Sequence, residues 1–469
     1  MTPHRASGPD GDAGQGSAPP GRPSRPDRDD LRSLFVPPPG ARERVGIEVE
    51  SGLIDPTTGR SASYQGERGI LAVLETMLSE WGGERQQDAG RLTGILLPDG
   101  SQITLEHGGQ IEYSSAPGTG LAAAVADTRT ALERVAELAD RFGLALVPGA
   151  GLPFDRPDTV TWVPMTRGAI MRDFFSSIGE PGSRALEIMA TSTSTQVTLD
   201  YLSAEDFTEK LRMQIAASPV VAALLVNSPL RGGVSNGLLS HRSQAWLRMD
   251  PRRCGVLPPA LRSDVGIDDV IDWALRIPMV YYRTPEGRYR PAPDRPFATI
   301  LERGFDDGSM PTFDHWVSHM SQIWTNVRVR RTLELRAADS PPRHAIPAVP
   351  ALWTGLSYHR PARIAAWDLL GHYSEQDHRA AMDALPYQGL RTRLGGEPVR
   401  ELATELLRLA RTGLTARVRA GLEPQHVLSY LDPLDEILTT DRTFAEQLLT
   451  RWESDLRRDP RRYVDAYRV

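Results

Sequence analysis

Four short segments of the sequence alternate apolar and polar residues, and this pattern constrains the fold more than any other feature. Successive side chains of an extended strand point to opposite faces of a sheet, so each segment predicts one apolar and one polar face. In the first segment, Val45, Ile47 and Val49 alternate with Glu48 and Glu50. The other three read TLEHGGQIEYSS (104–115), TSTSTQVTLDY (191–201) and RTLELRAAD (331–339). If the four strands share one sheet, their polar side chains gather on the same side.

That shared face would be strongly acidic. The polar positions carry Glu48, Glu50, Glu106, Glu112 and Glu334, with Gln196 and Arg336 beside them. Carboxylates held close together repel one another, so their ionised forms need cations. Oxygen ligands without sulfur select Mg²⁺ or Mn²⁺ over zinc, and these ions commonly serve phosphate chemistry. The face therefore predicts an ATP site, built on a sheet because the sequence has no phosphate-binding loop of the form GxxxxGK[ST].

Each of these residues also has a purely structural explanation. Alternating acidic residues are common on the solvated face of a sheet, which would account for Glu48 and Glu50 taken alone. Glu334 and Arg336 could form a surface ion pair, and His107 is interpreted as a turn or packing residue. The repetition of the arrangement in four segments favours a functional site.

Two further segments contribute arginines. Arg167 and Arg172 lie in PMTRGAIMR, and Arg242, Trp246 and Arg253 lie in SHRSQAWLRMDPRRCG. Guanidinium groups bind carboxylates and phosphates through paired hydrogen bonds, so they suit an amino-acid substrate and a phosphate in transfer. Any one of them could equally be a surface arginine.

The remaining patterns predict an α+β fold: a curved, mainly antiparallel sheet with a polar active-site face, and helices packed on the other face. Apolar residues recur at helical spacing in several stretches. They are 67–82, 121–142, 204–226, 267–277, 313–325, 363–370, 399–420 and 442–457. Residues 1–40, rich in Pro, Gly and Ser, are expected to be a disordered leader. Residues 41–469 are expected to form a single catalytic domain with a helical C-terminal part, and 228–265 an ordered functional loop within it.

Composition argues against several classes of protein. No run of about 18 apolar residues could span a bilayer, and 54 basic residues scattered among 60 acidic ones make nucleic acid a poor partner. The single cysteine, Cys254, excludes an intramolecular disulfide and a cysteine-rich zinc site. The single cysteine, together with the lack of an apolar secretion signal, indicates a cytoplasmic protein. Cys254 is interpreted as a packing residue, because no histidine is paired with it in its motif.

Taken together, the segments resemble the glutamate–cysteine ligases of plants, proteobacteria and actinobacteria, including those of ergothioneine biosynthesis. The resemblance rests on GIEVE, LEHGGQIEYSS, PMTRGAIMR, STSTQVTLD, VNSPLRGG, HRSQAW and RTLELRAAD, in this order. It implies a glutamine-synthetase-like ligase fold and an ATP-dependent reaction. ATP would phosphorylate the γ-carboxylate of glutamate. The α-amine of cysteine would then attack the acyl phosphate, giving γ-glutamylcysteine, ADP and phosphate.

The resemblance also implies roles for individual residues. The expected ligands of two or three Mg²⁺ ions are Glu48, Glu50, Glu106, Glu112, Gln196 and Glu334, with Gln196 at a position where a more distant branch has histidine. The expected catalytic residues are Arg336, which would stabilise the transferred phosphoryl group, and Arg253. The expected substrate-binding residues are Arg167, Arg172, Arg242 and Trp246. Two alternatives stay open: a ligase of the same fold that uses another amine, and a non-catalytic binding protein. The oligomeric state is also open.

Overall fold

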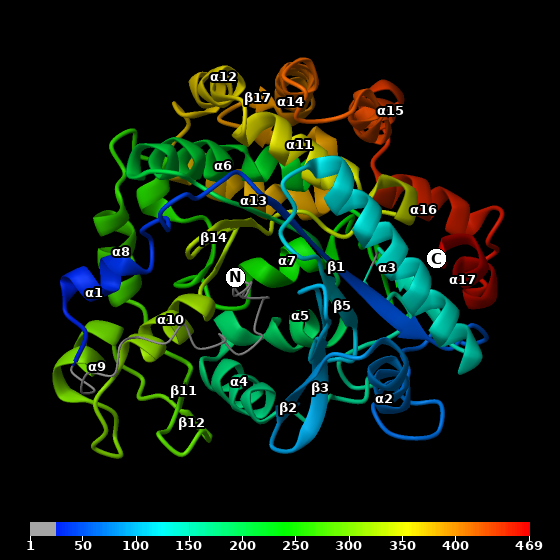
Figure 1. Ribbon diagram of the computed structural model, residues 1–469. Helices are drawn as coiled ribbons and strands as arrows, with labels where there is room; N and C mark the ends of the chain where they lie inside the picture. The colour runs from blue at the N-terminus through cyan, green and yellow to red at the C-terminus, as the bar shows by residue number, and fades with distance from the viewer. Residues whose placement is uncertain (1–24, 150) are drawn as a thin grey trace.

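The central element of the protein is a nine-stranded sheet, seen here in a computed structural model that describes residues 25–149 and 151–469. The strand order is β14–β15–β7–β1–β5–β4–β3–β2, with β6 also paired to β1 (Figure 1). Every pairing in this sheet is antiparallel. The strands are β1 (Val45–Ile54), β2 (Glu84–Asp88), β3 (Arg91–Leu96), β4 (Gln102–Leu105), β5 (Ile111–Ser114), β6 (Ala145–Pro148), β7 (Thr195–Leu199), β14 (Val327–Val329) and β15 (Leu333–Leu335). The predicted antiparallel sheet is confirmed.

The register at the centre of the sheet places the acidic segments beside one another. On β1, Glu48 lies opposite Gln196 of β7 on one side and Ser114 of β5 on the other. Glu50 lies opposite Glu112 of β5. Directly opposed residues point to the same face of a sheet, so the polar positions of neighbouring strands do converge.

The opposite face of the sheet is apolar and covered by helices. Ile47, Val49, Val197 and Leu335 are buried in one large core. Helices α3 (Leu121–Arg141) and α11 (Ala348–Ser357) pack on this face, where both contact β1. The prediction of one helix-covered face is therefore confirmed. The cleft described below is formed by the other face.

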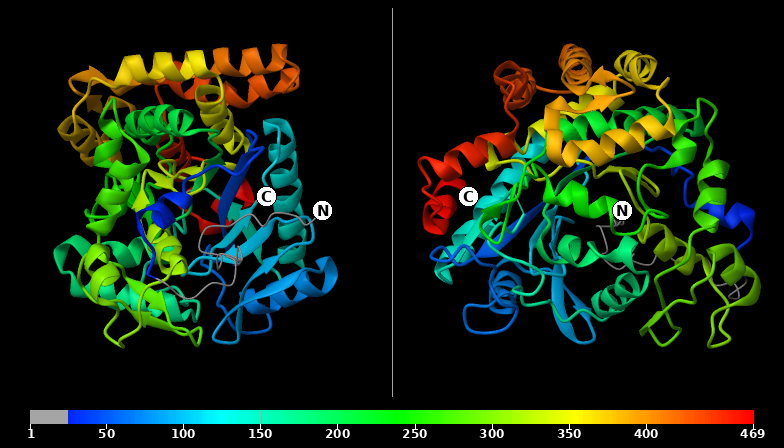
Figure 2. Two further views of the ribbon diagram at one scale, coloured as in Figure 1. Left: turned by 60° about the vertical axis from the view of Figure 1, so that its left-hand side comes forward. Right: turned by 180° about the vertical axis from the view of Figure 1, so that it is seen from behind.

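The C-terminal part is helical, as expected. Figure 2 shows α12 and α14 packed against α6 and α11 at one end of the molecule. The helices not yet given are α2 (Ile70–Trp81), α4 (Thr166–Ser177), α5 (Ala185–Thr191), α6 (Ala204–Leu224), α7 (His241–Leu247), α8 (Ile267–Leu275), α9 (Phe297–Arg303), α10 (Phe313–Ser321), α12 (Arg360–Leu370), α13 (Glu375–Gln388), α14 (Val399–Arg419), α15 (Asp432–Thr440), α16 (Phe444–Glu453) and α17 (Pro460–Tyr467). No described helix combines the length and the apolar character needed to cross a bilayer.

The segment TLEHGGQIEYSS is a hairpin and not one extended strand, which corrects the sequence interpretation. The chain turns between β4 and β5, where the Glu106 N–H donates to the Gln110 carbonyl at 2.9 Å. The turn needs both glycines. Gly109 has a φ of +90°, and a Cβ added to Gly108 would lie 1.9 Å from the Ala190 carbonyl oxygen. Strict alternation therefore does not relate Glu106 to the strand after the turn.

The expectation of a disordered leader is wrong for its last part. Residues 1–24 lie outside the described residues, but α1 (Arg28–Ser33) follows them, with a capping box at Asp27. Leu31, Leu34 and Phe35 are buried in the main core, and the Trp316 indole N–H donates to the Leu31 carbonyl at 3.1 Å. These three apolar side chains favour order because their burial offsets the entropy lost on fixing the backbone.

Candidate active site

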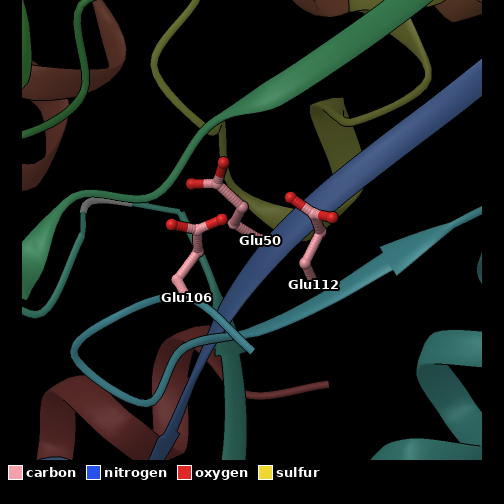
Figure 3. A group of neighbouring side chains, drawn as sticks. All are labelled: Glu50, Glu106 and Glu112. Atoms are coloured by element: carbon pink, nitrogen blue, oxygen red, sulfur yellow. The ribbon is translucent and has the colours of Figure 1, made fainter. Parts of the chain in front are cut away.

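Three carboxylates from neighbouring elements point toward one another on the polar face. Glu50 comes from β1, Glu112 from β5 and Glu106 from the turn that precedes β5. One oxygen from each lies within 4.8 Å of the others (Figure 3). The turn at Gly108 and Gly109 thus brings Glu106 to the same point as the two strand residues, although it lies outside the alternation.

The protein satisfies these carboxylates only in part. Glu50 accepts hydrogen bonds from the Ser194 N–H at 2.7 Å, the Ser194 hydroxyl at 2.8 Å and the Gln196 amide at 3.0 Å. Glu112 accepts from the Thr104 hydroxyl at 2.8 Å through one oxygen, while its Oε2 is buried and has no hydrogen-bond partner in the part of the chain that the structure describes. Burial raises the pKa of Glu50. Burial and the neighbouring glutamates raise the pKa of Glu112.

Glu48 lies beside this triad, toward Glu334. Its Oε2 is buried and has no hydrogen-bond partner among the described residues. Burial, followed by the negative charge of Glu334, raises the pKa of Glu48 to about 8. The residue therefore holds a proton at neutral pH unless a cation replaces it.

Glu334 is the one acidic residue of the set that is surrounded by cations. Arg328 lies 2.8 Å from its carboxylate, Arg330 lies 2.7 Å away, and Arg336 forms a third ion pair. Burial works against ionisation of Glu334, but the three guanidinium groups together lower its pKa. Glu334 is buried and Arg336 is only 11% exposed, so the explanation as a surface ion pair is wrong.

Arg336 links the acidic floor to helix α7. Its guanidinium donates to the Gln196 side-chain oxygen and contacts Glu334. Its central carbon lies 5.8 Å from the centre of the Trp246 ring, and that of Arg242 lies 6.0 Å from the same ring. Arg242 also donates to the Arg336 carbonyl at 2.7 Å.

A cleft lies over this floor. Helices α4, α5 and α7 supply part of its wall, including Met171, Met189 and Trp246. The carboxylates come from β1, from β5 and from the turn that precedes β5. The lining residues are Glu50, Glu106, His107, Glu112, Met171, Ile188, Met189, Ser192, Ser194, Gln196, Arg242, Trp246, Met249, Trp324, Arg328 and Arg336. The cleft thus combines an acidic floor, guanidinium groups and an apolar wall.

Three predicted arginines lie elsewhere. Arg253 is fully buried, with its Nε 2.8 Å from the Asp250 carboxylate. Arg172 of α4 lies 4.7 Å above the Trp162 ring, and burial lowers its pKa. Arg167 is in the first turn of α4. None of the three belongs to the cleft lining of the described residues, so their roles stay predictions that need a conformational change or an indirect effect.

Several residues of the site were missed from the sequence. Arg328 lines the cleft and pairs with Glu334, and the sequence did contain a signal for its position on the polar face. Arg328 and Arg330 alternate with Val327 and Val329 before the fourth acidic segment. The methionines of the wall carried no such signal, because they lie on helices and loops that only the fold brings together. Cys254 is buried and its pKa is raised to about 12, which fits a packing role.

The residues present fit a divalent metal ion. A hard cation needs several oxygen ligands in one place, and Glu50, Glu106 and Glu112 supply them. Among the described residues, one buried oxygen of Glu48 and one of Glu112 have no hydrogen-bond partner, and the pKa values of both residues are raised. The protein's own cations therefore do not fully neutralise these carboxylates, and a bound cation would do so.

Comparison with known proteins indicates one family. The family model described as "Glutamate-cysteine ligase family 2 (GCS2)" matches residues 44–463. The chloroplastic glutamate–cysteine ligase of Brassica juncea is 30% identical over 415 residues, which cover 88% of this chain and 78% of that protein. The corresponding enzyme of Arabidopsis thaliana is 30% identical over 417 residues, with 88% and 77% covered.

Solved structures share the fold. The glutamate–cysteine ligase of Francisella tularensis in complex with AMP superposes with a TM-score of 0.54 at 11% identity, covering 90% of this chain and 88% of that one. A bifunctional glutathione synthetase of Pasteurella multocida gives a TM-score of 0.52 at 13% identity, covering 94% of this chain and 53% of that one. At these identities the likeness concerns architecture.

Proposed function

The chain belongs to glutamate–cysteine ligase family 2, and from this premise we propose that it joins the γ-carboxylate of glutamate to the α-amine of cysteine at the expense of ATP. The proposal rests on one observation above all. An acidic group that can hold metal ions lies next to guanidinium groups in a single cleft. Transfer of a phosphoryl group needs both kinds of group. The carboxylates hold the metal ions that bind the phosphates, and the guanidinium groups neutralise the charge on the phosphoryl group as it is transferred.

Under this proposal the acidic residues of the site bind metal ions. Glu50, Glu106 and Glu112 would hold Mg²⁺, with Glu48, Gln196 and Glu334 next to them. Mg²⁺, when bound, neutralises phosphate charge and orients the phosphates. Mn²⁺ would suit the same oxygen ligands. The nucleotide assignment is supported by the AMP complex of the Francisella ligase, which shares the fold.

The reaction balances without a nucleophilic side chain. A γ-carboxylate oxygen of glutamate attacks the terminal phosphorus of ATP, and ADP leaves. The neutral amine of the acceptor then attacks the acyl carbon and gives up a proton to the departing phosphate, which leaves with one oxygen of the original carboxylate. Under this proposal Arg336 would stabilise the charge on the transferred phosphoryl group, while Arg242 and Trp246 would shape the adjoining wall. The protein's main contribution is therefore position and charge.

The apolar wall supports cysteine as the acceptor. Met171, Met189, Met249, Trp246 and Trp324 offer polarisable sulfur and aromatic surface, which pack well against a thiol. A different amine in a specialised pathway remains the alternative, because the same wall would accept other small apolar side chains. A binding protein without activity is disfavoured by the retained acidic group, whose burial has a cost that binding alone does not require.

Incubation with ATP, Mg²⁺, glutamate and a panel of amines tests the proposal. Mass spectrometry of the products, with ADP and phosphate measured in parallel, should show γ-glutamylcysteine formed in step with ADP. Turnover with another amine and none with cysteine would establish the alternative ligase. An absence of turnover with every amine would favour the binding protein. Glu106→Gln should abolish the reaction, and a variant as active as the wild type would refute the metal site.

A further inference from the structure

Asp339 ends the fourth acidic segment, yet no step of the proposed reaction uses it. Its side chain is only 1% exposed, and its backbone forms an isolated bridge with Ser194. A buried carboxylate is costly unless it is paired and hydrogen-bonded. The partners of Asp339 therefore indicate what its carboxylate does.

The carboxylate ties together two segments that meet at the start of α7. Oδ2 accepts hydrogen bonds from the Asn227 N–H at 2.9 Å and the Ser228 hydroxyl at 2.8 Å, and Oδ1 accepts from the Ser240 hydroxyl at 3.1 Å. The Ser240 oxygen in turn accepts from the Ser243 N–H at 2.9 Å, which caps the N-terminus of α7. Asp339 thus fixes where the helix begins.

Asp339 also faces the first cleft residue of that helix. Arg242 Nη1 lies 3.7 Å from Asp339 Oδ1, and the two side chains are 5% and 1% exposed, so water screens the pair little. The other terminal nitrogen of Arg242 donates to the Arg336 carbonyl at 2.7 Å. One helical turn further on, Trp246 lies against both guanidinium groups.

We propose that Asp339 is a positioning residue that orients Arg242, and through α7 Trp246, toward the cleft before substrate binds. This inference rests on the proposed function, since it assigns Arg242 to an anionic group of the substrate. A guanidinium held in one orientation loses less conformational entropy on binding. The negative charge of Asp339 also offsets the positive charge of buried Arg242, which lies close to the positive charge of Arg336.

Asp339→Asn tests the proposal because it keeps the size of the side chain and removes its charge. We expect kcat/KM to fall about 10- to 100-fold, the effect typical of losing a hydrogen-bonded charged partner. Arg242→Gln should cause a similar loss, and the double variant should be no worse than Arg242→Gln within about threefold. Losses that multiply in the double variant would overturn the proposal, because they would mean that Asp339 acts independently of Arg242.

Asp200→Asn is the matched control. Asp200 is also a buried carboxylate paired with an arginine, Arg44 at 3.1 Å, and it follows β7 outside the cleft. Its variant should change kcat/KM less than about threefold. Equal losses in both variants would point to general destabilisation and overturn the proposal. If Asp339→Asn does not fold, Ser228→Ala removes one donor instead. Its several-fold loss should vanish in the Arg242→Gln background, and a loss that persists there would overturn the proposal.

A crystal structure of Asp339→Asn separates this inference from the proposed function. The Arg242 guanidinium should leave the Arg336 carbonyl, and an unmoved guanidinium would overturn the positioning role whatever reaction the protein catalyses. A wild-type protein without ligase activity, together with a displaced Arg242 in the variant, would overturn the proposed function alone.

Discussion

Replacing Glu112 by glutamine should expose the electrostatic cost of the acidic group and its use in metal binding. One oxygen each of Glu112, Glu50 and Glu106 lie within 4.8 Å of one another. Two unit charges at that distance repel by about 3 kcal/mol at an effective dielectric constant of about 20. Burial, followed by repulsion from the neighbouring glutamates, raises the pKa of Glu112, and the group lowers this cost by keeping protons.

The sign of the stability change follows from proton linkage. An unfolded glutamate ionises near its ordinary pKa, whereas native Glu112 keeps its proton to higher pH, so the native state loses stability as pH rises between the two values. Glutamine cannot ionise and removes this loss. At pH 7 and without metal, we expect Glu112→Gln to be more stable than the wild type by about 1–3 kcal/mol.

Mg²⁺ should cancel or reverse the stability advantage of Glu112→Gln. Loss of a carboxylate ligand should weaken Mg²⁺ binding at least about 100-fold, which removes at least about 2.7 kcal/mol of the stabilisation that a bound ligand provides. Chemical denaturation at pH 7, with a chelator and with Mg²⁺, measures both effects. Glu80→Gln, which alters an exposed carboxylate paired with Arg141, is the control and should respond to Mg²⁺ as the wild type does. Equal stabilisation of Glu112→Gln and wild type by Mg²⁺ would refute the metal site.

Three other perturbations probe the same account. Mg²⁺ affinity should rise with pH and level off only above about pH 8, because Glu48, with a pKa of about 8, must release its proton; calorimetry that shows a flat profile between about pH 6 and pH 8 would contradict this. Arg336→Lys should lower the rate of ligation about 10²- to 10³-fold with little change in ATP binding, and an unchanged rate of ADP release would remove Arg336 from the chemistry. Leu31→Ala should lower the free energy of unfolding by about 2–5 kcal/mol because Leu31 is buried, while exposed Val36→Ala should change it by less than about 0.5 kcal/mol; equal effects would mean that α1 does not belong to the folded core.

The sheet and its polar face were predictable because each strand carries its own two-residue period. Val45, Ile47 and Val49 are buried in the main core on one side, and Glu48 and Glu50 lie on the other. The pattern could not tell a solvated face from a buried cleft, since both put polar residues at alternate positions. In fact every residue of β1 except Gly46 is classed as buried.

The features that could not be predicted from the sequence depend on contacts between distant segments. The position of Glu106 depends on a turn whose Gly108 packs against Ala190, far away in the sequence. The pairing of Glu334 with Arg328 depends on the register of two short strands. Order in α1 depends on a few apolar residues that are buried in the same core as Trp316, whose indole N–H donates to the Leu31 carbonyl. Local composition and spacing do not determine which of these distant segments meet.

The fate of the glutamate carboxylate oxygen tests the central claim most directly. Glutamate labelled with ¹⁸O in its γ-carboxylate should be incubated with ATP, Mg²⁺, cysteine and the protein, and the phosphate analysed by mass spectrometry. An acyl phosphate intermediate predicts one ¹⁸O atom in each phosphate released and ADP as the nucleotide product. Unlabelled phosphate, or AMP with pyrophosphate, would contradict the account.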